Sequence, residues 1–272
     1  MPLRPFKFAM LADIHYGTDK LHDGRIKTLS SRALSLTRYL VTRMNNELRP
    51  SFVVQLGDLI ESDDAEVDEE NFDTMLEALK PLSMPVYHVV GNHEQANLDV
   101  KVICSMLKYP KLYYSFDSGD FHFVVLFVAS KSPDDIHVDA AQRKWLAEDL
   151  SKTAKPTVVF VHYPIDEPDL TDSFWLDRNP NQCFVTERAD IRDTLSASGK
   201  VIAVFNGHLH RNNLLSHGGI NYVSLQSLVE NMSAKGKTAS ETFAVVTLTD
   251  KEIRVEIEGL DPAEYRITTA KK

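Results

Sequence analysis

The residues that could carry chemistry in this chain lie at five separated positions, and each position follows a short apolar run. The segments are Asp13-Ile14-His15, Gly57-Asp58, Gly91-Asn92-His93-Glu94, His162 and Gly207-His208-Leu209-His210. Imidazole and carboxylate groups bind divalent metals of the Mn, Fe and Zn type, and an Asn carbonyl is a further oxygen donor. One such segment is weak evidence, because Gly-Asp and His-x-His occur by chance. Together the segments supply enough ligands for two metal ions, provided that one carboxylate bridges them.

Apolar runs and helical spacings predict the elements that must position these ligands. The predicted strands of the first half span residues 6–12, 52–56 and 86–90, and the predicted helices span 26–44 and 72–79. This alternation of strands and helices predicts a largely parallel sheet that is covered by helices. Because ligands in such sheets gather at the carboxyl ends of the strands, the candidate ligands are expected to converge. Gly57, Gly91 and Gly207 precede ligands where the chain must turn sharply or approach closely.

The second half of the chain has a different pattern. A turn at 117–120 predicts an antiparallel hairpin, and a helix is predicted over 140–150. Further strands are predicted at 157–161, 201–205, 220–225, 242–248 and 253–257, the last three as antiparallel strands. The whole pattern predicts the α/β class, as a four-layer α/β/β/α sandwich of two mixed sheets flanked by helices. No repeat or linker divides the chain, so residues 1–272 are predicted to form a single domain.

Composition and charge restrict the class of partner. The formal net charge is −9, which argues against binding to nucleic-acid polymers and to anionic membrane surfaces. No stretch approaches the ~20 apolar residues of a membrane span. The N-terminus is not typical of a signal peptide, and the two cysteines supply no disulfide framework, so a cytoplasmic protein is expected. The acidic run 61–70 is predicted to be a solvated loop and a helix N-terminus, and the alternative is a negative rim that repels polyanions.

The five segments resemble the signature of the calcineurin-like metallophosphoesterases, which is D-x-H, G-D, G-N-H-[D/E], H and G-H-x-H. The match runs from Asp13 to His210, and the following strands fit the family's closing strands. The resemblance implies the four-layer sandwich and a pair of metal ions, which would be Mn, Fe or Zn. The implied ligands are Asp13, His15, Asp58 and His210 for the first metal and Asp58, Asn92, His162 and His208 for the second, with Asp58 bridging.

The resemblance also implies catalytic groups beside the metals. A metal-bound hydroxide would attack phosphorus, Asn92 would help to hold the phosphate oxygens, and His93 would protonate or stabilise the leaving oxygen. Glu94 stands where many relatives carry Asp, and it would orient His93. The purple acid phosphatases, which are similar, need a metal-bound Tyr three residues after the bridging Asp. Glu61 occupies that position here, so a tyrosinate–Fe(III) site is not expected.

Residues 54–58, 84–94 and 223–230 resemble the manganese-dependent ADP-ribose/CDP-alcohol diphosphatases, and the class III cyclic-nucleotide phosphodiesterases are similar in the same motifs. His15 departs from the diphosphatases, where Gln is expected, and fits the wider family. The predicted activity is therefore hydrolysis of a small phosphodiester or of a nucleotide-linked diphosphate. The alternatives are a phosphomonoesterase, which includes the protein phosphatases, and a non-catalytic interaction scaffold of the same fold that is similar to retromer's small subunit.

The candidate substrate contacts lie beside the ligands and in one long loop. Tyr16, Tyr163 and Arg211 each follow a ligand directly, and a guanidinium can pair with phosphate through two hydrogen bonds. The polar segment 164–183 carries Phe174 and Trp175 at its centre, and an aromatic pair there could stack on a base or anchor the loop.

Overall fold

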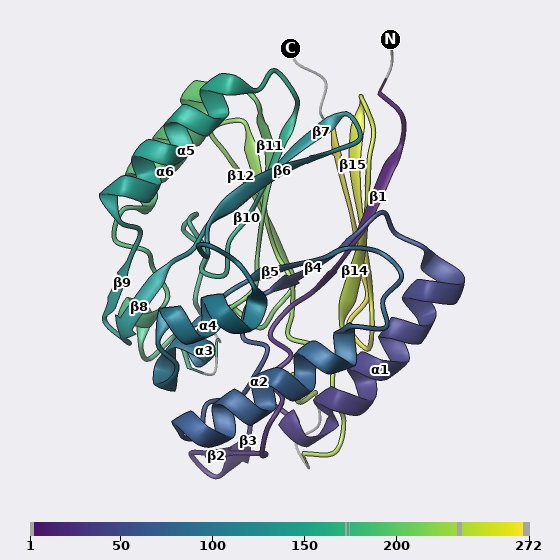
Figure 1. Ribbon diagram of the computed structural model, residues 1–272, viewed down its shortest axis with the longest axis vertical. Helices are drawn as coiled ribbons and strands as arrows, with labels where there is room; N and C mark the ends of the chain where they lie inside the picture. The colour runs from purple at the N-terminus through teal and green to yellow at the C-terminus, as the bar shows by residue number, and fades with distance from the viewer. Residues whose placement is uncertain (1–2, 172, 174, 233–235, 269–272) are drawn as a thin grey trace.

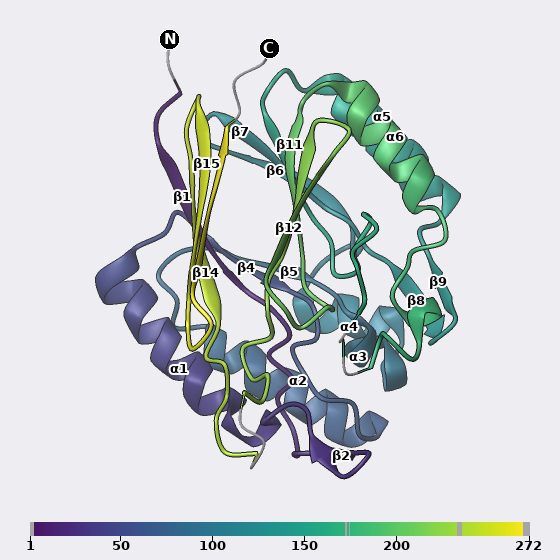
Figure 2. The same ribbon diagram turned by 180° about the vertical axis from the view of Figure 1, so that it is seen from behind.

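Two six-stranded mixed sheets pack face to face, and helices cover both outer faces (Figure 1, Figure 2). This arrangement is seen in a computed structural model that describes residues 3–171, 173, 175–232 and 236–268. The strands of the first sheet, in spatial order, are β16 (Ala263–Thr268), β15 (Glu252–Glu258), β14 (Phe243–Leu248), β1 (Phe6–Leu11), β4 (Val53–Leu56) and β5 (Val86–Val89). Those of the second sheet are β12 (Asn213–His217), β13 (Ile220–Ser224), β11 (Val201–Asn206), β10 (Thr157–Phe160), β7 (Phe121–Val125) and β6 (Tyr114–Ser118). The predicted four-layer sandwich is confirmed.

Each sheet combines a group of parallel strands with antiparallel strands. In the first sheet β1, β4 and β5 are parallel, while β14, β15 and β16 add antiparallel strands. In the second sheet β7, β10, β11 and β13 are parallel, and β6 and β12 are antiparallel edges. Parallel strands end at the same edge of their sheet. The residues that follow β1, β4, β5, β10 and β11 are therefore brought to one end of the sandwich.

Aromatic side chains fill the space between the two sheets. Phe8 of the first sheet meets Phe160 of the second in an edge-to-face contact with ring centroids 5.6 Å apart. Phe123 and Phe160 stack at 6.0 Å, and all of these rings are fully buried. Such offset and edge-to-face pairs add to the free energy of burial, so this cluster holds the two sheets together.

Helices cover the outer faces because each presents one apolar stripe to its sheet. α1 (Ala33–Arg43) and α2 (Ala65–Leu79) pack on the first sheet through buried Leu36, Leu40, Phe72 and Met75. α5 (Ala140–Lys152) and α6 (Arg188–Ser198) cover the second sheet (Figure 2). No helix in the described part of the chain is long and apolar enough to cross a lipid bilayer.

Smaller elements surround the end of the sandwich where the ligands gather. They are the hairpins β2 (Leu21–His22) with β3 (Arg25–Ile26) and β8 (Ala129–Ser132) with β9 (Asp135–His137), the helices α3 (Asn92–Asn97) and α4 (Val100–Leu107), and the short turns η1 (Ser30–Arg32) and η3 (Pro180–Gln182). The short helix η2 (Met44–Leu48) instead follows α1 and precedes the start of β4. Figure 1 shows α3, α4 and the β8–β9 hairpin on one side of that end and the β2–β3 hairpin on another.

Some predicted elements differ from the structure. The predicted helix over 26–44 is wrong at its start, since Ile26 lies in β3 and the α-helix begins only at Ala33. Helical spacing alone does not detect this hairpin, which closes around Gly24 at a φ of 74°. The prediction for 220–225 is partly wrong because β13 pairs in parallel with β11. Helices α3, α4 and α6 were not predicted.

Candidate metal centre

The ends of five parallel strands bring the candidate ligands together. Asp13 follows β1, Asp58 follows β4 and Asn92 opens α3 just after β5, while His162 and His208 follow β10 and β11. Backbone hydrogen bonds continue beyond the strands: Asp13 N–H donates to the Gly57 carbonyl over 3.1 Å, and His15 N–H donates to the Asp58 carbonyl over 2.9 Å. The first two ligand loops are therefore fixed against each other.

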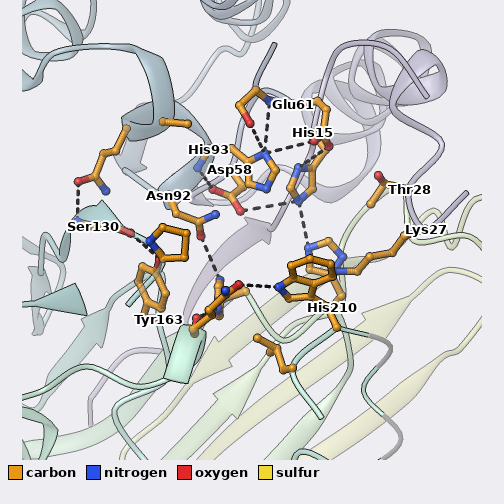
Figure 3. Close-up of a pocket in the computed structure, with 18 of the residues that line it drawn as sticks. His15, Lys27, Thr28, Asp58, Glu61, Asn92, His93, Ser130, Tyr163 and His210 are labelled. Carbon is orange, nitrogen blue, oxygen red and sulfur yellow. Dashed lines mark hydrogen bonds and ion pairs between the residues drawn. The ribbon is translucent and has the colours of Figure 1, made fainter. Parts of the chain in front are cut away.

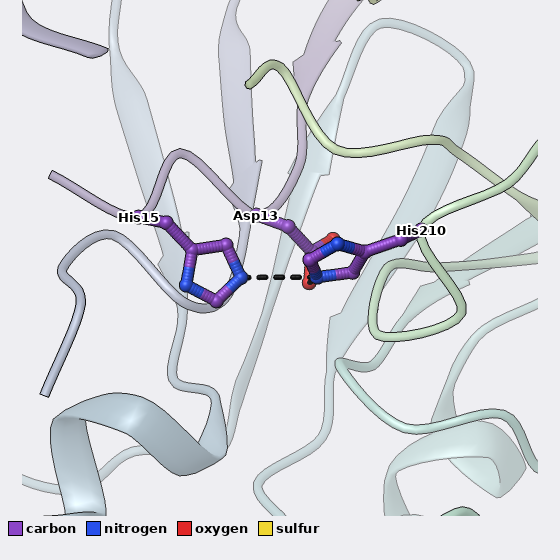
Figure 4. A group of neighbouring side chains, drawn as sticks. All are labelled: Asp13, His15 and His210. Atoms are coloured by element: carbon purple, nitrogen blue, oxygen red, sulfur yellow. Dashed lines mark hydrogen bonds and ion pairs between the residues drawn. The ribbon is translucent and has the colours of Figure 1, made fainter. Parts of the chain in front are cut away.

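Asp13, His15 and His210 form the first group of neighbouring ligand atoms (Figure 4). The Nε2 atoms of His15 and His210 lie 3.0 Å apart, and Nε2 of His210 lies 3.4 Å from Oδ1 of Asp13. The backbone N–H of His208 donates to the same Asp13 carboxylate over 3.0 Å. All three ligand side chains are buried, which leaves few positions for solvent between their donor atoms.

Asp58, His162 and His208 form a second group, which Asn92 completes. Oδ2 of Asp58 is 3.3 Å from Nε2 of His162. Oδ1 of Asn92 lies 3.1 Å from both Nε2 of His162 and Nδ1 of His208. Asp58 also touches the first group, since its Oδ2 is 3.7 Å from Nε2 of His15.

Each of the four histidines has its outer ring nitrogen close to an oxygen atom, through a hydrogen bond in three of them and through an ion-pair contact in His15. The acceptors are Glu61 for His15 at 3.2 Å, the Leu56 carbonyl for His162 at 2.9 Å, the Gln182 carbonyl for His208 at 3.0 Å and Glu230 for His210 at 2.8 Å. A proton on the outer nitrogen leaves a lone pair on the inner nitrogen. Such outer hydrogen bonds orient the histidines of metal sites and set their tautomers.

This donor set fits metal ions. With their outer nitrogens protonated, His15 and His210 direct the lone pairs of their Nε2 atoms at each other over 3.0 Å, and a cation held by both nitrogens would satisfy this arrangement. Two ligands at right angles around an ion about 2.1 Å away lie about 3.0 Å apart, which agrees with the spacing in both groups. Imidazole, carboxylate and amide oxygen suit Mn, Fe and Zn.

The site carries a negative charge that cations would offset. Burial raises the pKa of Asp58, but the neighbouring His162 and His93 outweigh that effect and hold it well below its ordinary value. Burial likewise opposes ionisation of Glu61, whose contact with His15 nevertheless lowers its pKa to about 2. Burial lowers the pKa of His162, but the Asp58 carboxylate raises it to about 9, so without a cation the ring holds a second proton at neutral pH that a metal ion would displace. The carboxylates are thus ionised at neutral pH.

The backbone is strained at the same residues. Nine non-glycine residues in the described part of the chain have positive φ, and five of them are candidate ligands. Their φ values are 48° at Asp13, 48° at His15, 53° at Asp58, 64° at His208 and 52° at His210. Non-glycine residues occupy this region rarely, and such strain gathers at functional sites.

Two of the glycines before the ligands are required by their surroundings. Gly57 has a φ of 102°, and a Cβ there would overlap the ring of His162. A Cβ on Gly91 would overlap the carboxylate of Asp58. The chain can therefore approach the ligands this closely only with glycine at these positions.

His93 lines the cavity beside His15, with the centroids of the two rings 4.5 Å apart. Its backbone N–H donates to Oδ1 of Asp58 over 2.9 Å. Its Nδ1 lies 3.3 Å from the Ser62 backbone nitrogen and 3.4 Å from Oε1 of Glu61, so Nε2 is the nitrogen left for a ligand. Burial lowers the pKa of His93 to about 4, which keeps the ring neutral near pH 7.

The structure places the carboxylate of Glu94 against backbone groups of the neighbouring loops. Its buried carboxylate accepts from the backbone N–H groups of Gly91 over 2.8 Å, of Asp58 over 3.2 Å and of Leu59. Glu94 therefore fixes the loop that carries Asp58, and Glu61 and Ser62 are the groups that contact the His93 ring. Glutamate suits this task because it reaches back across the first turn of α3 to its N-terminus.

Glu61 was missed as a site residue, because the sequence places it at the start of an acidic run. In the structure it is 5% exposed and touches both His15 and His93. The later part of the run forms the N-terminus of α2, where Asp64 accepts from the N–H groups of Glu66 and Val67. The helix interpretation is confirmed for α2, whereas the solvated-loop interpretation is wrong for Glu61.

A cavity of about 440 Å³ opens onto both groups of ligands (Figure 3). Tyr163 and Trp175 are among its lining residues, whereas Tyr16 and Arg211 are not. Arg211 instead points its guanidinium at the Thr171 carbonyl, 3.3 Å away. Phe174 lies outside the described residues. Sequence reasoning missed Lys27, Gln95 and Gln182, which also line the cavity.

Comparisons with known proteins agree with this geometry. The family model described as calcineurin-like phosphoesterase matches residues 6–212. The chain is 23% identical to the manganese-dependent ADP-ribose/CDP-alcohol diphosphatase of Homo sapiens, over 99% of this chain and 94% of that protein. It is 27% identical to the serine/threonine-protein phosphatase CPPED1 of Danio rerio, over 80% of this chain and 74% of that protein.

Solved structures with the same fold include two phosphatases. A dimetal phosphatase from Danio rerio aligns with a TM-score of 0.78 at 19% identity, over 99% of this chain and 100% of that one. Purple acid phosphatase PPD1 from yellow lupin aligns with a TM-score of 0.69 at 14% identity, over 98% of this chain and 54% of that one. At these identities the similarity supports the fold.

Proposed function

Because the chain belongs to the calcineurin-like phosphoesterase family, we propose that it hydrolyses a small phosphodiester or a nucleotide-linked diphosphate at the centre described above. In this proposal Asp58 serves both metal ions, since its carboxylate touches both groups of ligands. The remaining ligands are Asp13, His15 and His210 for the first ion and Asn92, His162 and His208 for the second.

The observation that carries this proposal is the orientation of the four histidines. Each has its outer nitrogen close to an oxygen atom and its inner nitrogen directed at a carboxylate, an amide oxygen or another histidine. Bound there, two ions would hold phosphoryl oxygens and lower the pKa of a bound water. A scaffold protein has no need of four histidines oriented in this way, so the site favours an enzyme.

The chain's own residues supply the rest of the chemistry. Asn92 presents its side-chain oxygen to the second group, and α3 holds it next to His93. His93 directs Nε2 into the cavity and donates a hydrogen bond to the leaving oxygen. Glu61 and Ser62 hold the ring of His93 from the Nδ1 side. The neutral ring would act as a hydrogen-bond donor that stabilises the charge on the leaving oxygen, and assistance at a leaving group contributes about 10²–10⁴ in rate.

Cavity size and similarity to relatives support the substrate class. A volume of about 440 Å³ lies within the range of roughly 300–1,000 Å³ that holds small molecules. The relative that aligns with nearly the whole chain acts, by its name, on ADP-ribose and CDP-alcohols. With a net charge of −9, this protein repels long polyanions, so the proposed partner is a small phosphorylated molecule.

A phosphomonoesterase that acts on proteins is the second candidate. The zebrafish relative named as a serine/threonine-protein phosphatase favours it, at 27% identity over 80% of this chain. The same metal centre would serve that reaction. Only the substrate measurement separates the two candidates.

A screen with Mn²⁺-loaded protein tests the proposal. The compounds are bis-p-nitrophenyl phosphate, p-nitrophenyl phosphate, cyclic AMP, ADP-ribose and CDP-choline, each with and without EDTA. We expect metal-dependent turnover of the diester and of at least one diphosphate. A strict preference for p-nitrophenyl phosphate would support the second candidate, and no metal-dependent turnover of any compound would contradict both.

A further inference from the structure

The cavity extends past the metal ligands to a wall that comes from two other segments. One segment is the β2–β3 hairpin with the residues that follow it, and the other is the loop that contains Trp175 and Gln182. The ring of His22 meets that of Trp175 with centroids 6.0 Å apart, and Asp23 pairs with Arg178 at 2.9 Å. These contacts join the two segments across the mouth of the cavity.

Lys27 gives this wall a positive charge. It is the single lysine or arginine among the residues described as lining the cavity. Figure 3 shows it on the same side as His15, Thr28 and His210, opposite Ser130 and Tyr163. Its side chain is partly buried, and no carboxylate of the described residues pairs with it. A positive charge that lines the cavity and has no carboxylate partner attracts anions, so the cavity favours a ligand that brings a negative charge.

The backbone holds Lys27 at a fixed place relative to the metal centre. Its carbonyl accepts from the Asn231 N–H over 2.7 Å, and the next residue, Thr28, forms an antiparallel bridge with Glu230. Glu230 is the acceptor that engages Nδ1 of His210. The position of Lys27 is therefore coupled to the first group of ligands.

Trp175 gives the wall an aromatic face with a fixed orientation. Its indole N–H donates to Oε1 of Gln182 over 2.7 Å, and the carbonyl of the same Gln182 accepts from Nε2 of His208 over 3.0 Å. The residue is 41% exposed, which leaves area for stacking. One residue thus links the aromatic face to the second group of ligands.

We propose that Lys27 and Trp175 form a subsite for the nucleoside phosphate half of a diphosphate substrate. This inference rests on the proposed function, because one phosphoryl group must occupy the metal centre. The metals would offset the charge of the phosphoryl group at the metal centre. An ester with a single phosphate therefore leaves Lys27 without a partner. A diphosphate supplies the second phosphate for Lys27, and a base stacks on Trp175. Lysine binds phosphate as a compact point charge, and base stacking tolerates different bases.

A diphosphate that is bound in this way is hydrolysed at the metal centre with one water. The water oxygen bonds to the phosphorus at the metal centre, and the bridging P–O bond breaks with its electron pair remaining on the departing phosphate. The products are two phosphate monoesters, and the protons of the water pass to them or to solvent. The ammonium of Lys27 stabilises the negative charge on the phosphate that it holds.

The test compares three substrates of the Mn²⁺-loaded protein. ADP-ribose has a base and two phosphates, the p-nitrophenyl ester of thymidine 5′-monophosphate has a base and one phosphate, and bis-p-nitrophenyl phosphate has one phosphate and no base. For Lys27→Met we expect kcat/KM to fall about 10- to 100-fold on ADP-ribose, the size of a charge-assisted contact. The two p-nitrophenyl esters should change less than about threefold, and Lys27→Arg should restore most of the loss.

Two further variants control for charge and position. Lys237→Met removes the same charge from an exposed residue outside the cavity lining and should leave all three rates unchanged. Arg211→Ala tests the other candidate for the phosphate contact, which was suggested because Arg211 directly follows the ligand His210. A selective loss on ADP-ribose in Arg211→Ala, with Lys27→Met unaffected, overturns the assignment of the second phosphate to Lys27.

A change at Trp175 is expected to affect a different set of substrates. Trp175→Ala should lower kcat/KM about tenfold on both substrates that carry a base and leave bis-p-nitrophenyl phosphate unchanged. An equal loss on all three substrates, in either variant, means a structural role and overturns the subsite while the phosphoesterase activity stands. Cleavage of bis-p-nitrophenyl phosphate but not of ADP-ribose by the wild-type protein would also overturn the subsite and leave the phosphoesterase activity standing. No turnover of any substrate with Mn²⁺ overturns the proposed function itself.

Discussion

At the residue scale, Asp58 is the carboxylate that lies between the two groups of candidate ligands. Its Oδ2 atom is 3.3 Å from His162 and 3.7 Å from His15, and its Oδ1 accepts the backbone N–H of His93. One side chain therefore joins both metal positions and the segment that carries the proposed acid. Neighbouring loops hold it there through the carboxylate of Glu94, which accepts the Asp58 backbone N–H.

Replacing Asp58 with Ala should remove metal and activity together, because each ion loses a ligand and the pair loses its common one. Metal analysis after dialysis should find fewer than two ions per chain, and turnover should fall to background. The matched control is Asp73→Ala, which removes an exposed carboxylate from α2. Two tightly held ions in the Asp58 variant would contradict the bridging assignment.

Replacing His93 with Ala should cost about 10²–10⁴ in kcat on substrates with an alkoxide leaving group. Metal content should barely change, since Nε2 of His93 faces the cavity and not a ligand group. The loss should shrink on p-nitrophenyl esters, whose leaving group needs little protonation. Rates measured on both kinds of ester decide the point, and an equal loss on both would count against assistance at the leaving oxygen.

At the element scale, strand ends place the ligands while hairpins and caps support them from outside. One such support lies away from the centre. His122 of β7 lies between Asp117 of β6, at 2.7 Å, and Asp149 of α5, at 2.8 Å. Ser115 donates to Asp149 and Lys155 pairs with Asp117. A neutral imidazole has one N–H, so both contacts are complete only when His122 is protonated.

This contact predicts a pH-dependent contribution to stability. The hydrogen bond to Asp149 raises the pKa of His122 above 6.5 against the effect of burial, so its stabilisation is fully present below about pH 6.5. The stabilisation is lost as the pH rises through the folded-state value. It is also lost in acid, because the contacts with Lys155 and His122 lower the pKa of Asp117 below its ordinary 3.8.

The measurement is denaturant unfolding of wild type and His122→Gln at pH 5.5 and at pH 9. We expect the variant to lose about 1 kcal/mol at pH 5.5, a modest value because Asp117 is 53% exposed and screened by solvent. The loss should be smaller at pH 9. His217→Gln, at an exposed position, should change neither value. A difference that does not depend on pH would mean that packing, and not charge, is what His122 supplies.

At the scale of the whole molecule, the metal centre joins the two sheets. Asp13, Asp58 and Asn92 follow strands of the first sheet, whereas His162, His208 and His210 follow strands of the second. Each proposed ion is held by ligands from both. The aromatic cluster between the sheets and the ions at the ends of their strands therefore both oppose separation of the two sheets.

Metal removal should accordingly lower the melting temperature. An ion that binds only the folded chain adds about 2.7 kcal/mol when its free concentration is a hundredfold above Kd. Thermal unfolding with Mn²⁺ should occur several degrees higher than with EDTA. Asp58→Ala should lose this difference, while His122→Gln should retain it. Identical melting temperatures for the wild type in Mn²⁺ and in EDTA would contradict metal binding across the two sheets.

The sequence by itself determined the family, the layers of the sandwich and the candidate ligands. Strand periodicity and the convergence of parallel strand ends act locally, so motifs such as Asp13-Ile14-His15 can be placed without knowing the rest of the fold. The same logic failed for Arg211, because adjacency to a ligand does not determine direction where the preceding His210 has a left-handed backbone at a φ of 52°.

Only the tertiary structure decided which groups surround the ligands. Glu230 reaches His210, Gln182 connects His208 to Trp175, and Lys27 enters the cavity from a hairpin that helical spacing did not predict. These side chains come from loops, whose paths depend on packing between segments far apart in the chain. No local pattern fixes such contacts, since the burial and the charges that select them exist only once both sheets and their loops are assembled.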